Sequence, residues 1–326
     1  MAQKTNGVIL MKPDEKCLAL DLGGTKLLIG IVSGAGEILA SRAYPSPLAG
    51  GADQREVAAG MLASLDDFLA FHSLEGVTCM GAGVVGRVDN ARGLWLEIDP
   101  RLCETVALAR VLGERCGLPC RVDNNVRCAL RAERLFGRGK GLDDFIYVNI
   151  GTGIAAGIVT GGHMIKGAHF NGGETGHVAV DISGDAQCPC GRTGCAEAIA
   201  AGSGLDRRAR ALRSRYPRTR LTIPEKAPCR GDEIFRLARE GDALCLRLAM
   251  DAAEAAAALI QNLIWTFDPE AVVLGGGVVS DPWMFDQITQ RLTKDCMRFI
   301  HGIQLTSLDP RLTGLIGAAM CGFDAP

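Results

Sequence analysis

The sequence lacks the features of several large classes of protein. Its formal net charge is only −2, so a general binder of polyanions is not expected. No apolar run approaches the roughly 20 residues that a membrane-spanning helix needs. The start of the chain does not resemble a signal peptide, because the apolar run at 8–11 is short and charged residues at 12–16 interrupt it. We therefore expect a cytoplasmic protein that binds neither membrane nor nucleic acid.

Two common nucleotide-binding motifs are also missing. There is no P-loop pattern, and no G-x-G-x-x-G sequence opens a helix after the first predicted strand. These absences disfavour the P-loop and Rossmann folds. With 326 residues and 48% hydrophobic content, the chain is nevertheless long enough for two domains with well-filled cores.

Cysteine, in contrast, is abundant. The chain has 13 cysteines and no secretion signal, which favours a reducing compartment and argues against disulfides. Most of them, such as Cys17, Cys79 and Cys128, lie in apolar surroundings. A free cysteine in such surroundings packs as a small hydrophobic residue, so we expect these side chains to be buried.

The segment 177–197 holds the densest cysteine cluster and is the most informative part of the chain. One histidine and three cysteines lie within it: His177, Cys188, Cys190 and Cys195. Because glycine and proline separate the cysteines, a tight knuckle is expected, and three unrelated core cysteines fit less well. A Cys3His set suits tetrahedral zinc, and four protein ligands leave no open position for water. We therefore predict a structural zinc site.

Strand and helix patterns alternate along the chain. Apolar strands are predicted at residues 16–22, 27–32, 38–44, 77–84, 120–122, 145–150, 155–160 and 271–274. Helices are predicted at residues 54–71, 104–116, 126–136 and 244–267. The strands at 145–150 and 155–160 are joined by a glycine-rich turn, and this pair repeats the opening pair at 16–22 and 27–32. The repetition predicts an internally duplicated α/β architecture.

We expect two domains. The N-terminal α/β domain is placed at residues 1–120, and a C-terminal helix at about 311–326 is expected to pack back on it. The C-terminal α/β domain is placed at 121–310 and contains the knuckle at 177–197. A homodimer or a higher homo-oligomer is expected.

The ends of three predicted strands carry the chemistry. Asp21 lies near the end of the first strand, before Gly23, Gly24, Thr25 and Lys26. A carboxylate there could orient a hydrated magnesium ion, and the amides of the turn could contact phosphate. Taken alone, this segment could equally be an ordinary turn. Similar turns follow two later strands, and the three together indicate a nucleotide site; their residues are Gly151, Thr152, Gly153, Gly275, Gly276 and Gly277.

Four segments together resemble the ROK family of repressors, open reading frames and sugar kinases. They are residues 21–26, 167–177, 188–197 and 268–277, and the likeness runs from about residue 16 to residue 319. The resemblance implies the actin-like ATPase fold, in which two RNase H-like domains close a cleft on ATP and a hexose. It also implies transfer of the γ-phosphoryl group to a sugar hydroxyl, with ATP and Mg²⁺ as cofactors.

The resemblance further implies which residues hydrogen-bond the sugar, namely Asn124, Glu174, His177 and Glu197. His177 is at the same time a predicted zinc ligand, and Glu197 closely follows the last cysteine. The zinc would then hold this sugar-binding wall rigid.

The catalytic position departs from the family pattern. Family kinases carry an Asn-Asp pair after a short strand, and the aspartate takes the proton of the sugar hydroxyl, whereas this chain has Asn124 and Asn125. An amide cannot act as a general base, although it can still hold the hydroxyl in line. Base catalysis contributes about 10² to 10⁴-fold, so we expect a slowed reaction. Asp123 is an unfavourable substitute, because side chains alternate along a strand.

Other positions near the expected sugar site differ as well. Residues 83–86 read Gly-Val-Val-Gly where Gly-x-Pro-Gly is usual, and residues 95–100 replace a segment that usually carries a sugar-reading asparagine. Phe170 stands where glycine is common, and Arg127 where asparagine is common. These differences predict an unusual ligand, with a group that Arg127 or His169 could engage.

Two classes of function remain open. The favoured one is an ATP-dependent kinase that phosphorylates a hexose or an N-acetylhexosamine. The alternative is a non-catalytic sugar sensor, because Asn-Asn-Val-Arg at 124–127 is similar to the sequence of some repressor-branch members. A sensor would have little use for Asp21 and Thr25, and only about 15 residues precede the first strand, too few for a winged helix-turn-helix.

A basic stretch at residues 207–220 could suggest nucleic acid. It contains seven arginines, Arg207, Arg208, Arg210, Arg213, Arg215, Arg218 and Arg220. No aromatic residues are interleaved with the arginines in a binding pattern, and no helix-turn-helix accompanies them. A solvated helix face and loop is therefore predicted.

Overall fold

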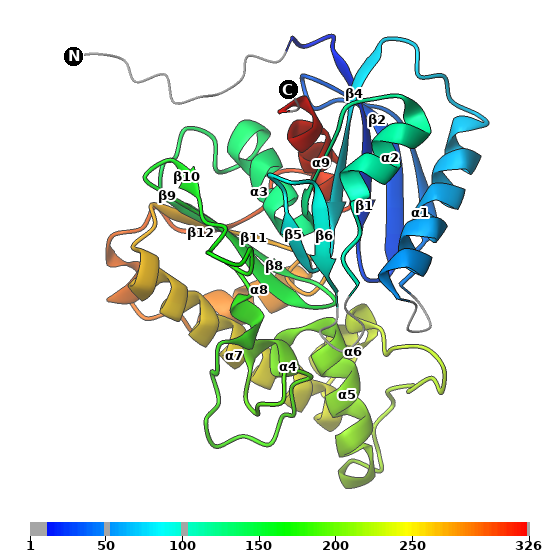
Figure 1. Cartoon of the computed structure of the whole chain (residues 1–326). Helices are drawn as coiled ribbons and strands as arrows, with labels where there is room; N and C mark the ends of the chain where they lie inside the picture. The colour runs from blue at the N-terminus through cyan, green and yellow to red at the C-terminus, as the bar shows by residue number, and fades with distance from the viewer. Residues whose placement is uncertain (1–11, 49–52, 99–103, 325–326) are drawn as a thin grey trace. The chain divides into compact units, whose positions relative to one another are not determined.

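The computed structural model describes residues 12–48, 53–98 and 104–324. The chain divides into two compact units (Figure 1). The first unit consists of Met1–Gly141, Lys166–Gly172 and Leu308–Pro326, and the second of Leu142–Ile165 and Gly173–Ser307. Each unit is built around a five-stranded sheet.

The first unit has the strand order β3-β2-β1-β4-β7. Its strands are β1 (Lys16–Leu22), β2 (Lys26–Ser33), β3 (Ile38–Pro45), β4 (Val77–Val84) and β7 (Cys120–Asn124). The first three strands form an antiparallel meander, and β4 and β7 run parallel to β1. The carboxyl ends of β1, β4 and β7 therefore meet at one edge of the sheet.

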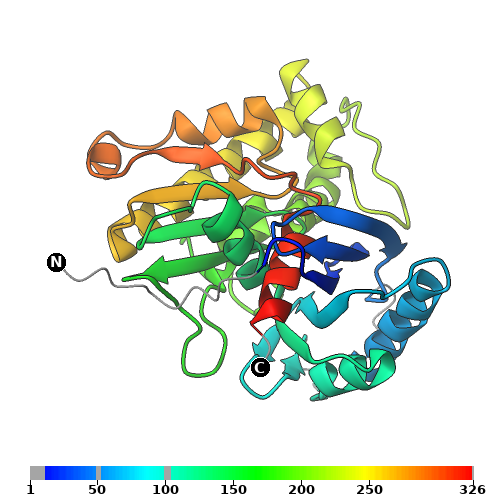
Figure 2. The ribbon, with the colours of Figure 1, turned by 90° about the horizontal axis from the view of Figure 1, so that it is seen from above.

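Side-chain alternation along β1 explains how helices cover both faces of this sheet. Leu18 and Leu20 pack in one core with α1 (Gln54–Leu69) and α2 (Leu108–Cys116). Cys17 and Ala19 point the other way, into a core with α3 (Asn125–Phe136) and α9 (Thr313–Phe323). Figure 2 shows α9 in red beside the blue strands. The C-terminal helix thus packs on the first sheet.

The domain boundary predicted at residue 120 is wrong. The strand β7 pairs with β4, and α3 packs against α9, so residues 120–141 complete the first unit. Sequence patterns do not show which sheet a short strand joins, because strand pairing is a long-range contact.

The second unit repeats the same strand order with β10-β9-β8-β11-β12. Its strands are β8 (Phe145–Ile150), β9 (Ile154–Thr160), β10 (His163–Met164), β11 (Ala271–Gly275) and β12 (Ile303–Leu305). Again the first three are antiparallel, and the last two run parallel to β8. The predicted duplication is confirmed, and this strand order is that of the RNase H-like domains that the resemblance implied.

Helices and short 3₁₀ turns account for most of the second unit's remaining core. The helices are α4 (Ala196–Ala200), α5 (Gly202–Leu212), α6 (Gly231–Arg239), α7 (Ala243–Phe267) and α8 (Pro282–Thr289). The 3₁₀ turns are η1 (Thr175–His177), η2 (Arg213–Arg215) and η3 (Cys296–Arg298). Ile146 and Val148 pack with these helices, and α7 presents small buried residues such as Ala252 and Ala256 to them. Small side chains let the helices approach closely.

Several short elements were not predicted. They include the hairpin β5 (Arg87–Asp89) and β6 (Leu94–Glu97), which is too short to show a clear period. The predicted start of a helix at residue 104 is wrong, because Val106 forms a β-bridge with Trp95 and α2 begins at Leu108. Within the described ranges, none of the helices is both long and apolar enough to span a bilayer.

Candidate functional site

The β1–β2 turn places the first predicted phosphate-binding residues in the first unit. The amide of Gly23 donates to the carbonyl of Lys26 at 2.9 Å, and the Ser46 hydroxyl donates to the Gly23 carbonyl at 2.8 Å. These bonds hold the turn, while Gly24 and Thr25 stay exposed at its tip. The free amides there can contact an anion.

Asp21 lies next to this turn and close to the start of α9. A Cβ atom at Gly314 would collide with the Asp21 carboxylate, so the carboxylate packs directly against the backbone of α9 at this glycine. Desolvation raises the pKa of Asp21 from 3.8 to about 6, although Lys26 opposes the shift. The carboxylate is thus ionised at neutral pH but titrates near it.

Asn124 and Asn125 lie where β7 passes into α3. Asn124 is the N-cap of α3, and its side-chain oxygen accepts hydrogen bonds from the amides of Val126 and Arg127 at 2.9 and 3.2 Å. Its side-chain nitrogen donates to the carbonyl of Gly86 at 3.0 Å. Asn125 is the first helical residue and is only partly buried. The backbone that presents Asn125 is therefore held by its neighbour.

Asp123 does not replace the missing base. Its side chain is fully buried, and its two oxygens accept hydrogen bonds from Arg127 Nε at 2.7 Å and Arg131 Nη2 at 2.8 Å. A buried carboxylate that accepts from two guanidinium groups presents no free lone pair toward solvent. Its role is structural.

Arg127 is likewise unavailable to a ligand, contrary to the prediction. Its side chain is 3% exposed, and besides Asp123 it donates to the carbonyls of Val88 at 3.2 Å and Phe170 at 3.3 Å. Phe170 has a φ of 61°, a left-handed conformation that is rare for a bulky residue. Arg127 and Phe170, which both differ from the residues common in the family, therefore contact each other.

Two further contacts hold the segment Lys166–Gly172 within the first unit. Lys166 Nζ donates to Asn90 Oδ1 at 3.1 Å, and Arg87 Nη1 donates to the carbonyl of His169 at 3.3 Å. Trp95 is fully buried and donates its indole N–H to the carbonyl of Val85. The altered segment at 95–100 thus begins with a core residue; residues 99 and 100 lie outside the described ranges.

The second unit brings two glycine-rich turns together. The turn Gly151-Thr152-Gly153 joins β8 to β9 and is closed by a hydrogen bond from the amide of Gly151 to the carbonyl of Gly153 at 3.0 Å. The segment that follows β11 lies against it, because the amide of Val278 donates to the carbonyl of Ile150 at 3.0 Å. Gly275, Gly276 and Gly277 therefore adjoin the turn Gly151-Thr152-Gly153.

The knuckle forms a compact donor cluster. One ligand atom from each of His177, Cys188, Cys190 and Cys195 lies within 4.8 Å of the others. Cys188 Sγ is 3.5 Å from His177 Nδ1, and Cys190 Sγ is 3.6 Å from Cys195 Sγ. Tetrahedral zinc with Zn–S bonds of about 2.3 Å separates its sulfur ligands by about 3.8 Å. The donor set and its spacing therefore fit zinc.

The three cysteines of the cluster differ: desolvation raises the pKa of Cys188 and Cys195, whereas the pKa of Cys190 is lowered towards the thiolate state that a metal needs. The backbone amide of Arg192 lowers the pKa of Cys190, which lies on the exposed side of the cluster. Because Nδ1 of His177 faces Cys188, its Nε2 is the ring nitrogen left for another partner. A histidine bound through Nδ1 can thus serve a metal and a ligand at once.

The sugar-binding residues predicted in the second unit border this cluster. Glu174 precedes η1, His177 ends it, and Glu197 lies in the first turn of α4, whose N-cap is Cys195. Sequence analysis missed that Glu197 also accepts a hydrogen bond from the amide of Ile154, at 2.9 Å. No sequence signal indicates this contact, because the two residues are 43 positions apart.

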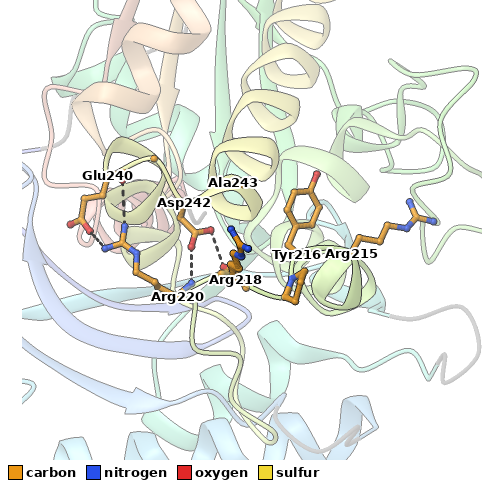
Figure 3. Close-up of a pocket in the computed structure, with 10 residues that line it drawn as sticks. Arg215, Tyr216, Arg218, Arg220, Glu240, Asp242 and Ala243 are labelled. Atoms are coloured by element: carbon orange, nitrogen blue, oxygen red, sulfur yellow. Dashed lines mark hydrogen bonds and ion pairs between the residues drawn. The ribbon is translucent and has the colours of Figure 1, made fainter.

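The second unit also contains a separate open cavity of about 620 Å³, shown in Figure 3. Its acidic groups are engaged within the protein. Asp242 accepts from Thr219 Oγ1 at 2.8 Å and from the amide of Arg220 at 2.7 Å, and Glu240 pairs with Arg220. Arg215 and Arg218 are exposed at its edge.

The basic stretch behaves largely as predicted, as a helix face and loop. It covers α5, η2 and the following loop. Several of its arginines form ion pairs within the unit: Arg208 with Asp251, Arg210 with Asp206 and Arg220 with Glu240. Much of its charge is therefore neutralised locally.

Comparison with known proteins agrees with this arrangement. The model of the ROK family matches residues 17–321. A glucokinase of Thermotoga maritima is 29% identical over 94% of this chain and 97% of its own length. The crystal structure of a ROK family glucokinase from Streptomyces griseus, in complex with glucose and AMPPNP, is 28% identical with a TM-score of 0.78, over 95% of this chain and all of that one.

A regulator has a similar structure. It is a ROK family transcriptional regulator, a homologue of the E. coli MLC protein, with 25% identity and a TM-score of 0.76 over 94% of this chain and 77% of the regulator. Both kinase and regulator therefore share the duplicated RNase H-like architecture of the actin-like ATPase fold. The family match covers both sheets, the three glycine-rich turns and the cysteine cluster, and the chain belongs to the ROK family.

Proposed function

We propose that this protein is a sugar kinase that transfers the γ-phosphoryl group of ATP to a hydroxyl of a hexose or an N-acetylhexosamine. The observation that carries the proposal is that the chain has Asp21 beside a glycine-rich turn in the first unit and two adjoining glycine-rich turns in the second. A glucokinase of the same fold binds glucose and an ATP analogue, which supports the same ligand classes here. The turns at 23–26, 151–153 and 275–277 would receive the nucleotide.

Phosphoryl transfer depends mainly on positioning and on charge stabilisation. A magnesium ion bound with the nucleotide would neutralise charge that develops on the phosphates. Asp21 is suited to orient its water ligands, because the carboxylate is ionised at neutral pH and adjoins the first turn. Amides of Gly24, Thr152 and Gly153 would hold phosphate oxygens in place, since the amide of Gly151 closes its own turn.

The sugar would be held by Glu174, His177 and Glu197, and by the second N–H of the Asn124 side chain, since the other polar groups of that side chain are bonded within the first unit. A zinc ion at the knuckle would restrict His177 and the N-terminal turn of α4, so that these side chains keep their orientation without the sugar. His177 Nε2 would then donate to a sugar hydroxyl, since its other nitrogen faces the cluster. Zinc therefore has a structural role in the proposal.

Asn125 makes the reaction slow in this proposal. It can accept a hydrogen bond from the attacking hydroxyl but cannot remove the proton, and Asp123 is held by two arginines. Replacing Asn125 with Asp should raise kcat by about 10² to 10⁴-fold, measured as ATP consumption across a panel of hexoses and N-acetylhexosamines. Wild-type turnover at ordinary kinase rates with no gain in N125D would refute the role of Asn125.

The second candidate function is sugar sensing without catalysis. The observation that favours it is the lack of a carboxylate at position 125, together with the likeness to a transcriptional regulator. Thermal shift with a sugar panel, with and without magnesium-ATP, separates the two. Stabilisation by sugars alone favours a sensor, whereas stabilisation by nucleotide as well favours the kinase. A cytoplasmic location and a homo-oligomeric state stay predictions.

A further inference from the structure

Glu197 makes a contact that binding of a sugar does not require. Its Oε2 accepts a hydrogen bond from the amide of Ile154 at 2.9 Å. Ile154 is the first residue of β9 and directly follows the turn Gly151–Gly153. A carboxylate that accepts from a backbone amide makes a charge-assisted bond, which is stronger than a neutral one. One side chain therefore reaches from the knuckle to the proposed phosphate turn.

The packing around this contact is tight. A Cβ atom at Gly153 would lie 2.8 Å from Glu197 Oε2, and one at Gly176 would lie 3.1 Å from Glu197 Cβ and would collide with the carbonyl of Ile154. Glycine at both positions lets η1, α4 and the turn approach one another. The Glu197 side chain is thus packed between Gly153, at its carboxylate, and Gly176, at its Cβ atom.

The residues that follow Glu197 hold the same turn. The amide of Gly202 donates to the carbonyl of Gly151 at 2.8 Å, and the amide of Ser203 donates to the carbonyl of Thr152 at 3.1 Å. With Cys195, a predicted metal ligand, at the other end, residues 195–203 connect the cluster to the turn. Because the carbonyls of Gly151 and Thr152 accept from this segment, the segment restrains the conformation of the turn.

We propose that Glu197 is a positioning residue for the nucleotide, which holds the Gly151–Gly153 turn ready for phosphate and connects it to the cysteine cluster. The identity of the ligand rests on the proposed kinase function. In this arrangement Oε2 braces the turn, and Oε1 is left to meet a sugar hydroxyl. Binding of sugar and binding of nucleotide are then coupled through a single side chain, and each raises the affinity for the other.

The test compares Glu197→Ala with Glu197→Gln. A glutamine oxygen can still accept from the amide of Ile154, whereas alanine cannot. Titration calorimetry with Mg²⁺ and AMPPNP, without sugar, should show affinity about tenfold or more weaker in E197A and within about threefold of wild type in E197Q. Glu254→Ala is the matched control, because it removes an exposed carboxylate of the second unit outside the proposed sites and should leave nucleotide affinity unchanged.

Hydrogen exchange gives a readout that does not depend on any ligand. Exchange at the Ile154 amide should rise about tenfold or more in E197A and stay close to wild type in E197Q. Unchanged exchange in E197A, or unchanged nucleotide affinity, overturns the positioning role. If wild type binds AMPPNP but phosphorylates no sugar, the kinase function fails and the positioning role stands. If wild type binds no nucleotide, only the exchange result decides whether Glu197 braces the turn.

Discussion

The two strand turns of the duplicated fold occupy the same place in their sheets and differ in charge. Asp21 pairs with Leu28 one residue before the end of the first hairpin, and Asn149 pairs with Ala155 at the matching place in the second. The first turn therefore carries its own carboxylate. The second has a neutral side chain there and receives a carboxylate from outside, at the amide that follows the turn.

Under the proposed function, this difference would separate two tasks, namely binding of magnesium and binding of phosphate. A carboxylate beside the first turn suits magnesium, which prefers oxygen ligands and negative charge. The second turn offers backbone amides without a negative side chain at its strand end, which suits phosphate. The duplicated scaffold thus has its carboxylate at the strand end before the first turn, and at the amide after the second turn. Exchanging the charges of Asp21 and Asn149 tests this directly.

The largest effect is expected from Asp21→Asn. Without the carboxylate, magnesium is no longer oriented beside the first turn, and loss of several kcal/mol of transition-state stabilisation lowers kcat by about 10³-fold or more. Initial rates with saturating sugar and ATP measure this. Sugar affinity, read by thermal shift, should stay unchanged as the control. A variant that keeps a tenth of the wild-type rate would show that Asp21 does not serve the metal.

Removal of the metal should increase hydrogen exchange in the second unit and leave exchange in the first unit unchanged. With the ion chelated, or in Cys190→Ser, sugar affinity should fall by about 10 to 100-fold, because His177 loses its orientation. Metal analysis should give about one zinc per chain in the wild type and none in the variant.

Cys116→Ser is the control for this experiment, since Cys116 lies in the first unit outside the cluster. It should retain zinc and sugar affinity. Hydrogen exchange should rise around residues 151–203 and not around residues 16–33. Absence of zinc from wild-type protein purified without chelator would contradict the metal prediction.

A smaller effect is expected from Asn149→Asp, which gives the second turn the charge of the first. The new carboxylate would repel phosphate at neutral pH and weaken nucleotide affinity by about tenfold. Calorimetry with Mg²⁺ and AMPPNP at low and moderate salt measures it, and the loss should shrink as salt rises. Equal or tighter binding by N149D would mean that the second turn does not face phosphate.

The last effect concerns stability and pH, and no change in activity enters it. Burial raises the pKa of Asp21 from 3.8 to about 6, so the folded state binds this proton more tightly than the unfolded state. The free energy of unfolding is therefore highest below pH 3.8 and falls as the pH rises through 6. At about 1.4 kcal/mol per pKa unit, ionised Asp21 costs about 3 kcal/mol at pH 8. Asp21→Asn should therefore raise the melting temperature by a few degrees at pH 8, and by less at pH 5, measured without Mg²⁺. Equal shifts at both pH values would contradict the raised pKa.

The sequence predicted the repeated part of the fold well. Strands β1, β4 and β8 have the predicted bounds, because long buried apolar runs bounded by glycine or charged residues are strong local signals. The short elements β5, β6 and β12 and the helices α4 and α8 were not predicted, since a few residues show no period. The boundary at residue 120 failed because β7 joins its sheet through pairing with β4.

The candidate site, like the fold, was predictable where its residues are close in sequence and not where they depend on distant contacts. Close spacing in the sequence was enough to predict the cysteine cluster and the glycine-rich turns, since their chemistry comes from residues near one another. The environment of each side chain was not predictable. Arg127 looks like a free cation in the sequence, yet Asp123 and two carbonyls from other segments surround it.

The sequence by itself determined the family, the duplicated architecture, the set of possible metal donors, and the presence of Asn125 where family kinases carry aspartate. These follow from local composition and spacing, which the chain carries before it folds. Only the tertiary structure decided that Asp123 cannot act as a base, that Arg127 holds Phe170, and that Glu197 reaches the second turn. Each of these depends on which distant groups share a hydrogen bond, and such partners are chosen by packing of the whole unit rather than by neighbouring residues.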